Sequence, residues 1–301
     1  MRPLLKTLIR TTSYPLIAGG AALLLLYLAS VGVAYWPLFP LVVAVGITLV
    51  ALLERVAPYE PDWNRDHDDD TVADALHLFV SYLLIQGSVA FFFSLRIWVP
   101  ESWVLWPQQA PMWAQILLAG LILDLGLYIM HRASHASGFL WKLHAVHHSP
   151  ERFYWLNGGR RHPLSALVLA GPGLTLLFLL GATPIALGAW LSFMSVQLAF
   201  QHANLEYRLG PFRHLLGVAE MHRFHHKRDF EDAQVNFGEV FLIWDWMFGT
   251  LHDAPTSPRK GEVGLRDETA PSSYWAQLRW PFRGDDAARQ EIVRSAHPAK
   301  R

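Results

Sequence analysis

Nine of the 15 histidines of this 301-residue chain stand in four short groups between residues 131 and 226. Residues three or four positions apart lie on one face of a helix, so each closely spaced group can present its imidazoles in one direction. A structural zinc ion needs four protein ligands, so nine imidazoles suffice for two metal ions, and imidazole suits iron, zinc, copper or nickel. The candidate metal ligands are His131, His135, His144, His147, His148, His202, His222, His225 and His226.

Three further residues are candidates for catalytic roles beside such a site. Asp124 and Tyr128 share a helical stripe with the first histidine pair. A carboxylate inside an apolar segment is costly and marks a functional site by default, and a metal-bound histidine usually donates its second N–H to a carboxylate or carbonyl. We therefore expect Asp124 to accept a hydrogen bond from a ligand imidazole; a helix–helix hydrogen bond is the alternative. His162, which follows two arginines, is either a further site histidine or proton donor, or an interfacial residue.

The segments that must position these residues are strongly apolar. Hydrophobic residues make up 52% of the chain and charged residues 17%, against about 25% charged in a soluble domain, so lipid forms part of the solvent. About 20 apolar residues span a bilayer as a helix, which predicts four to six spans. The apolar runs are 14–35, 38–53, 72–99, 113–130, 164–181 and 184–200.

The predicted fold is all-α, a multi-pass bundle with a helical cap formed by 131–163 and 202–253. Basic residues near the start favour a cytosolic N-terminus, and alternating the direction of successive spans places every histidine group on the cytosolic side. The composition favours a bacterial inner membrane. We divide the chain into N-terminal transmembrane helices (1–110), a catalytic region (111–253) and a polar tail (254–301).

The overall composition excludes several classes of function. The 25 basic residues balance the 25 acidic residues, so there is no electrostatic reason to expect a nucleic-acid partner. The sequence has no cysteine, which excludes disulfides, a thiolate nucleophile and an iron–sulfur cluster held by this sequence.

The histidine groups, read with their flanking residues, resemble a known family. The segments HRASH, HAVHH, QHAN and HRFHH, together with Asn236-Phe237-Gly238 and Trp244-Asp245, are similar to those of the fatty acid hydroxylase superfamily, also called the sterol desaturase family. The resemblance covers residues 115 to 253, roughly half the chain. The first pair is HxxxH where acyl desaturases commonly have HxxxxH, which favours hydroxylation.

This resemblance implies an integral membrane, non-haem di-iron enzyme that uses O2 and electrons to hydroxylate or desaturate a lipid. The nine histidines would hold two iron ions. The substrate would be a sterol, a fatty acyl chain or another membrane lipid. The sequence has no dinucleotide-binding glycine fingerprint, so the electrons would come from a separate partner, such as a ferredoxin or small cytochrome with its reductase.

Other functions remain open from the sequence. A divalent-metal transporter would also use histidines, but transporters place their ligands near the bilayer midplane, whereas most histidines here lie outside the apolar runs. A membrane zinc protease would need HExxH, which is absent. A catalytically inactive lipid-binding relative is a further alternative.

Overall fold

The computed structural model describes residues 3–66, 70–98, 100, 104–266 and 268–283. Within these residues the chain is all-helical, and only isolated β-bridges join its loops. The long helices are α1 (Pro3–Tyr14), α2 (Gly20–Ser30), α3 (Leu38–Val56), α4 (Asp70–Leu95), α5 (Met112–Ala136), α7 (Pro163–Leu180) and α8 (Pro184–Gln201), with a π-helical turn η1 (Pro15–Gly19) joining α1 to α2.

Shorter helices form the predicted cap, which confirms the all-α architecture. They are α6 (Gly138–His148), α9 (Ala219–His225) and α10 (Ile243–Phe248), and a further short helix, α11 (Tyr274–Arg279), follows beyond the predicted cap. Single helical turns are η2 (Pro61–Asn64), η3 (Arg96–Trp98), η5 (Trp155–Gly159), η6 (Gly210–His214) and η7 (Trp280–Phe282).

Within the part of the chain that the structure describes, five helices are long and apolar enough to cross a membrane, so the chain is a multi-pass membrane protein. They are Pro3–Ser30, Leu38–Val56, Asp70–Trp98, Met112–Ala136 and Pro163–Leu180. The sixth predicted span forms α8, which does not belong to this set. Its sequence includes Ser192, Ser195 and Gln197, and it packs against α2, α3 and α5 inside the bundle.

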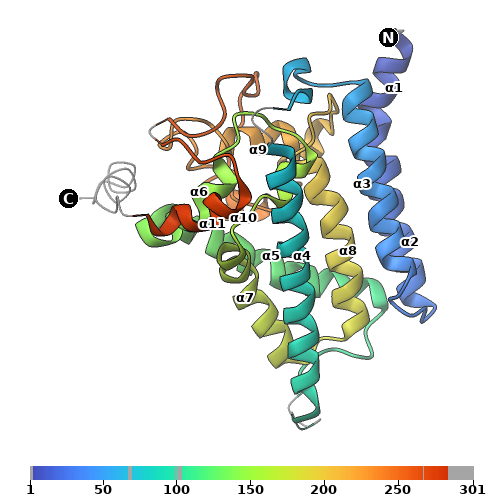
Figure 1. Cartoon of the computed structure of the whole chain (residues 1–301). Coiled ribbons are helices and arrows are strands. Elements are labelled where there is room, and N and C mark those ends of the chain that lie inside the picture. The colour runs from blue at the N-terminus through green and yellow to red at the C-terminus, as the bar shows by residue number, and fades with distance from the viewer. Residues whose placement is uncertain (1–2, 67–69, 99, 101–103, 267, 284–301) are drawn as a thin grey trace.

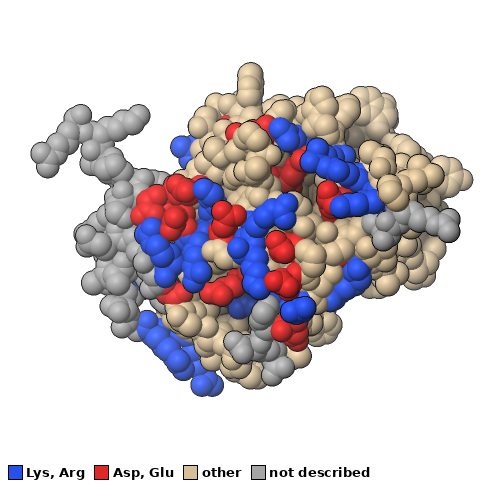
Figure 2. Space-filling model, turned by 90° about the horizontal axis from the view of Figure 1, so that it is seen from above, with Lys and Arg blue, Asp and Glu red and all other residues tan. Residues whose placement is uncertain are grey.

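The ends of the bundle differ in character. The N-terminus and the chain between α3 and α4 lie at one end together with α9, whereas the turns joining α2 to α3 and α7 to α8 lie at the other (Figure 1). Figure 2 shows the first end from above, where the side chains of Lys, Arg, Asp and Glu gather. A surface so rich in charge belongs in water, so the cap end faces an aqueous phase.

Close contacts fix α5 against its neighbours. A Cβ added at Gly120 would lie 2.5 Å from the ring of Trp190 on α8. Farther along α5, a Cβ added at Gly126 would lie 3.0 Å from the backbone of Gly173 on α7. Because these glycines let α5 approach both helices, the cap-side ends of α5 and α8 come together beneath the cap.

The region after residue 253 is not detached from the bundle. The helix α11 packs against α4, where Gln277 Oε1 accepts a hydrogen bond from His77 Nε2 at 2.8 Å. The predicted boundary at residue 254 stays a prediction, and the part of that tail beyond residue 283 lies outside the described residues.

Candidate metal centre

The four histidine groups meet where the cap covers the ends of α5 and α8. The first pair lies on the last turns of α5, one triplet lies on α6, the other lies on α9 and its C-cap residue His226, and His202 caps the end of α8. All nine histidines are buried. Their ring nitrogens form two sets, in each of which the candidate ligand atoms lie within 4.8 Å of one another. The first set is His131, His135, His144, His148 and His225; the second is His147, His202, His222 and His226.

Adjacent histidines serve different sets. His147 belongs to the second set and His148 to the first, whereas His225 belongs to the first and His226 to the second. Successive side chains of a helix point about 100° apart, so neighbouring histidines face different sides of the centre. The rings of His148 and His226 stack across the boundary with centroids 4.5 Å apart. The two sets are therefore adjacent parts of one centre.

The donor atoms fit metal ions on chemical grounds. A buried polar atom without a partner costs about 1–3 kcal/mol, and six ring nitrogens are in this position. They are His131 Nε2, His144 Nδ1, His147 Nε2, His202 Nε2, His222 Nδ1 and His225 Nε2. Other nitrogens face only one another: His148 Nε2 lies 3.2 Å from Nε2 of both His135 and His144. A metal ion bound at one nitrogen of each ring would satisfy the lone pair of that nitrogen.

Backbone carbonyls orient several of the rings. His131 Nδ1 donates to the carbonyl of Phe237 at 2.7 Å, and His225 Nδ1 donates to that of Val235 at 2.9 Å. His147 Nδ1 donates to the carbonyl of Arg160 at 3.2 Å. A hydrogen bond of this kind fixes the tautomer and turns the other nitrogen toward the metal.

The surroundings keep the cap histidines neutral. Burial, followed by the charges of neighbouring imidazoles, lowers the pKa of His148 and His222 well below the ordinary value. Burial likewise lowers the pKa of His144, His147, His225 and His226. A neutral imidazole has a free lone pair, so the rings are ready to coordinate a cation near neutral pH.

Asp124 has partners other than the expected imidazole. Its carboxylate accepts hydrogen bonds from the backbone N–H groups of Val240 and Phe241 at 2.9 and 3.0 Å, and from Trp244 Nε1 at 2.9 Å. The predicted hydrogen bond to a ligand is therefore wrong, because the loop before α10 and the first turn of α10 lie over this carboxylate and supply its donors. Asp124 holds the loop whose Phe237 carbonyl orients His131.

Replacing Asp124 should therefore act through this loop. Asp124→Leu leaves three donors, one buried and two partly buried, without their acceptor. It is expected to lower the free energy of unfolding by roughly 3–6 kcal/mol and to weaken metal retention. Asp124→Asn keeps one acceptor oxygen and should have a smaller effect. Thermal unfolding in detergent and metal content per chain measure both, with the exposed Asp232→Leu as control. Equal unfolding temperatures for Asp124→Leu and the control would contradict this role.

The other two candidate catalytic residues also have structural partners. The hydroxyl of Tyr128 lies 2.9 Å from Thr250 Oγ1, and its ring stacks on Phe248. His162 Nδ1 accepts from the N–H of Leu164 at the start of α7. Neither residue belongs to the two histidine sets, so a catalytic role for Tyr128 or His162 stays a prediction from the sequence.

One buried ion pair beside the second set was not singled out from the sequence. Arg160 Nη1 donates to Asp74 Oδ1 at 2.8 Å, and the carbonyl of Arg160 accepts the hydrogen bond of His147. Asp74 on α4 thus fixes the residue that orients a candidate ligand. The signal was available, because Asp74 is a carboxylate inside an apolar run, as Asp124 is.

A second buried ion pair lies beside the first set. Arg161 Nη2 donates to both carboxylate oxygens of Glu239 at 2.7 and 2.8 Å, and Glu239 Oε1 lies 3.9 Å from His131 Nδ1. Removing one member of such a pair leaves a buried charge without its partner. The pair therefore ties the chain before α7 to the loop that orients His131.

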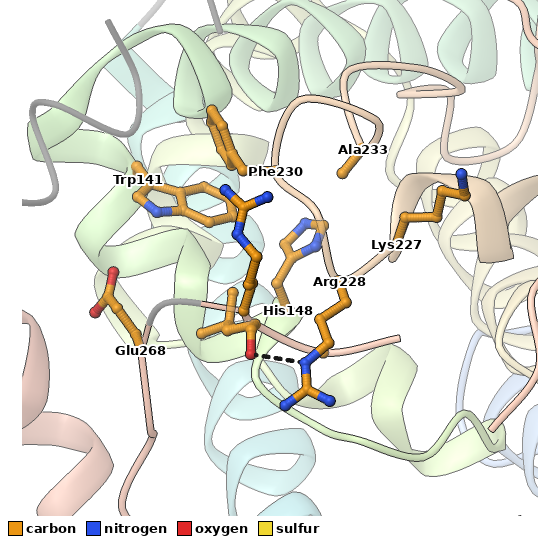
Figure 3. Close-up of a pocket in the computed structure, with 10 residues that line it drawn as sticks. Trp141, His148, Lys227, Arg228, Phe230, Ala233 and Glu268 are labelled. Carbon is orange, nitrogen blue, oxygen red and sulfur yellow. Dashed lines mark hydrogen bonds between the residues drawn. The ribbon is translucent and has the colours of Figure 1, made fainter. Parts of the chain in front are cut away.

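A small pocket opens from the cap toward the first set. Its inner wall includes His148, Trp141 and Phe230, and Lys227 and Arg228 lie beside it (Figure 3). The ring of Trp141 lies with its centroid 5.2 Å from that of His148 and 4.9 Å from that of His135. The pocket holds about 20 Å³, which is room for a water molecule. The pocket therefore reaches the first set directly at His148, beside the ring of Trp141.

Comparison with known proteins identifies relatives of the chain. The profile of the fatty acid hydroxylase family matches residues 116–250. An ornithine lipid hydroxylase of Rhizobium tropici is 31% identical over 256 residues, which cover 82% of this chain and 76% of the relative. An alkylglycerol monooxygenase of Danio rerio is 33% identical over 55% of this chain and 36% of the relative. Methylsterol monooxygenase 1 of Danio rerio is 28% identical over 65% of this chain and 66% of the relative.

No solved structure matches the chain. The family profile covers both histidine sets, and the similarity to the ornithine lipid hydroxylase extends over most of both chains. These findings confirm the resemblance and the prediction of an oxidoreductase that acts on lipids. The chain belongs to the fatty acid hydroxylase family.

Proposed function

We propose that the protein is a membrane-bound di-iron oxygenase that hydroxylates a C–H bond of a membrane lipid with O2 and external electrons. The observation that carries this proposal is the pair of adjacent, buried, all-imidazole sets at the end of the membrane helices. Imidazole sets of this kind suit iron among the first-row metals. When bound, a pair of iron ions would supply the O2 activation that attack on an unactivated C–H bond requires.

The residues of the chain have distinct tasks in this proposal. Nine neutral imidazoles would hold the metals, and backbone carbonyls such as that of Phe237 fix the ring orientations. The buried pair of Arg161 and Glu239 holds the loop above His131 in place. Burial of the whole centre excludes bulk water, which protects reactive species from side reactions.

The substrate class follows from the relatives. Their names describe hydroxylation of ornithine lipid and oxygenation of alkylglycerols and methylsterols. Because the ornithine lipid hydroxylase is similar along most of its length, we infer that the substrate is a polar membrane lipid and that the product is an alcohol. An amino-acid-headed lipid is the first compound to test.

Electrons and location complete the proposal. The sequence has no cysteine, so it holds no iron–sulfur cluster of its own, and we propose that a ferredoxin or small cytochrome with its reductase supplies the electrons. We place the protein in a bacterial inner membrane with the histidine centre facing the cytoplasm. The charged cap end and the bacterial relative support this placement.

The alternative of a divalent-metal transporter receives no support from the geometry. Transporter ligands lie near the midplane between broken helices. Here the histidines lie at the ends of α5 and α8 and on cap helices, and all are buried. No described pocket among the principal cavities passes through the histidine sets from one end of the bundle to the other.

Lipid analysis of membranes with and without the protein tests the proposed function. We expect a lipid class to gain the mass of one oxygen atom when the chain is expressed with its reductase system, and the purified protein to retain two iron ions. His147→Ala removes one candidate ligand. Membranes with this variant should show no oxygen gain in the lipid, and the purified variant should contain fewer than two iron ions. A loss of two hydrogens in place of the oxygen gain would establish desaturation, and unchanged lipids despite full iron loading would contradict an oxygenase.

A further inference from the structure

An apolar groove of about 490 Å³ opens on the membrane-facing side of the bundle. This volume lies within the roughly 300–1,000 Å³ typical of ligand pockets. No Asp, Glu, Lys, Arg or His lines it, and the lining side chains that carry a polar group are Tyr82, Trp155 and Ser195. The groove therefore suits an uncharged hydrocarbon chain.

The groove exists because two helix packings diverge. On one side, α4 packs against α7 and the turn η5; on the other, α3 packs against α8. Val43 and Ile47 of α3, Leu78 of α4 and Leu198 of α8 line the space between them, and the three helices stand next to one another in Figure 1. An opening between two membrane-spanning helices is accessible to a lipid that diffuses sideways in the bilayer.

The position of the groove along the helices selects one half of the bilayer. Its α4 residues lie between Ala75 and Tyr82, near the cap-side start of that helix, and its α8 residues lie between Ser195 and Ala199, near the cap-side end. The groove thus belongs to the leaflet next to the cap. A lipid of that leaflet could insert its chain while its polar headgroup stays at the aqueous interface.

The inner end of the groove lies against a candidate metal ligand. Gly158 lines the groove, and a Cβ at this position would lie 3.0 Å from His202 Nδ1 and 3.1 Å from the carbonyl oxygen of Leu198. Only a glycine lets the η5 turn rest directly on the His202 ring. A chain in the groove is therefore separated by the η5 turn from His202, which belongs to the second histidine set.

A buried carboxylate fixes this inner end. Glu54 Oε2 accepts hydrogen bonds from the N–H groups of Trp155, which lines the groove, and of Asn204, two residues after His202, both at 3.1 Å. Glu54 is fully buried at the end of α3. The turn η5 and the end of α8 are thus held together by one residue, so the groove and the histidine centre keep a fixed relative position.

We propose that this groove between α4 and the α3–α8 pair binds the acyl chain of a lipid from the cap-side leaflet and is the binding site through which the substrate approaches the centre. The proposal rests on the proposed function and adds a location and a leaflet to it. It also assigns chain recognition to α3 and α4, which lie outside the 116–250 segment matched by the family profile.

A pair of matched variants tests the groove. Ala75 lines the groove and is exposed, so Ala75→Trp should fill it without disturbing the core; Ala44 on α3 is exposed but does not line the groove, so Ala44→Trp is the control. The full-length protein is placed in phosphatidylcholine vesicles that contain a trace of phosphatidylcholine with a diazirine in its acyl chain. After photolysis, labelled residues are mapped by mass spectrometry.

We expect labelling of the groove segments around Leu78 and Leu198 in the wild type and in Ala44→Trp. Ala75→Trp should reduce this labelling about tenfold, which corresponds to about 1.4 kcal/mol of binding, with unchanged metal content. The same variant should lower kcat/KM for long-chain substrate more than for a short-chain analogue. Equal groove labelling in both variants, or labelling confined to the outer helix faces, would overturn the proposal. Because labelling needs no turnover, a wild type that labels but does not hydroxylate would contradict the proposed function and leave the groove standing.

Discussion

His225→Ala and His226→Ala are expected to abolish lipid oxidation while each removes a different metal ion. The two residues are adjacent in sequence, but His225 belongs to the first histidine set and His226 to the second. Changing even a residue that only supports a ligand typically costs 10–100-fold in metal affinity or activity, so loss of a ligand should reduce activity by more than about 100-fold. Metal content should fall from two ions to one per chain in each variant.

Metal analysis and product formation measure this result together. His214→Ala is the matched control, because His214 lies on the surface, pairs with Asp253 and belongs to neither set. The double variant His225→Ala/His226→Ala should lose both ions. If either single substitution released both ions, the two sets would not be independent sites; if neither released any, the assignment of ligands would be wrong.

Acidification is expected to destabilise the metal-free protein steeply. Burial lowers the pKa of each cap histidine, on α6 and α9, well below its ordinary value. Below pH about 6.5 the unfolded chain takes up protons on these residues and the folded chain does not. Because the unfolded state then binds more protons, stability falls as pH decreases. Each such histidine contributes up to about 1.4 kcal/mol per pH unit.

Two carboxylates outside the spans act with the opposite sign. Burial raises the pKa of Glu220 and Asp245, so the folded state binds their protons more readily and gains stability as pH falls. The six cap histidines outnumber them, and stability of a domain is only about 5–15 kcal/mol. The net effect should therefore be unfolding or opening of the cap within about two pH units below 6.5.

Thermal unfolding in detergent between pH about 7.5 and about 5 checks this expectation. Metal-loaded protein should stay folded to lower pH, because protons must first displace the bound metal from the histidines. A metal-free unfolding temperature that stays constant over this range would mean that the histidines are protonated in the folded protein, which would contradict their burial as neutral groups.

Local patterns in the sequence were sufficient to predict the positions of the helices and the set of candidate metal ligands. Six apolar runs became helices close to the predicted positions, because the length and composition of a segment decide whether it can be buried in lipid. Some helix boundaries differ from those of the apolar runs. The first helix begins at Pro3, before the apolar run, because the basic start of a helix can lie in water. Histidines spaced three or four residues apart within a group also lie on one helical face, as predicted, because this arrangement depends only on the helical repeat.

The hydrogen-bond partners of the site were not available from the sequence. The helical stripe correctly placed Asp124 near the histidines, but its partners come from a loop more than a hundred residues later. A carboxylate accepts hydrogen bonds from backbone N–H groups as readily as from imidazole N–H groups. The position of Asp124 on the helical stripe therefore did not reveal which donors it binds. Arg161 and Glu239 were missed for the same reason, since their pairing joins two distant loops.

The composition and residue spacing were enough to predict a helical membrane protein with nine histidines able to bind metal, and the segments around those histidines were enough to indicate the family. The division of the histidines into two sets, in which His147 and His148 face different partners, becomes visible only in the folded protein. The same holds for the proposed opening for a lipid chain, which comes from the separation of α4 from α3 and α8. Both depend on how helices distant in sequence rotate and pack against one another, which is set by contacts such as Gly120 with Trp190 and is not contained in the periodicity of any one segment.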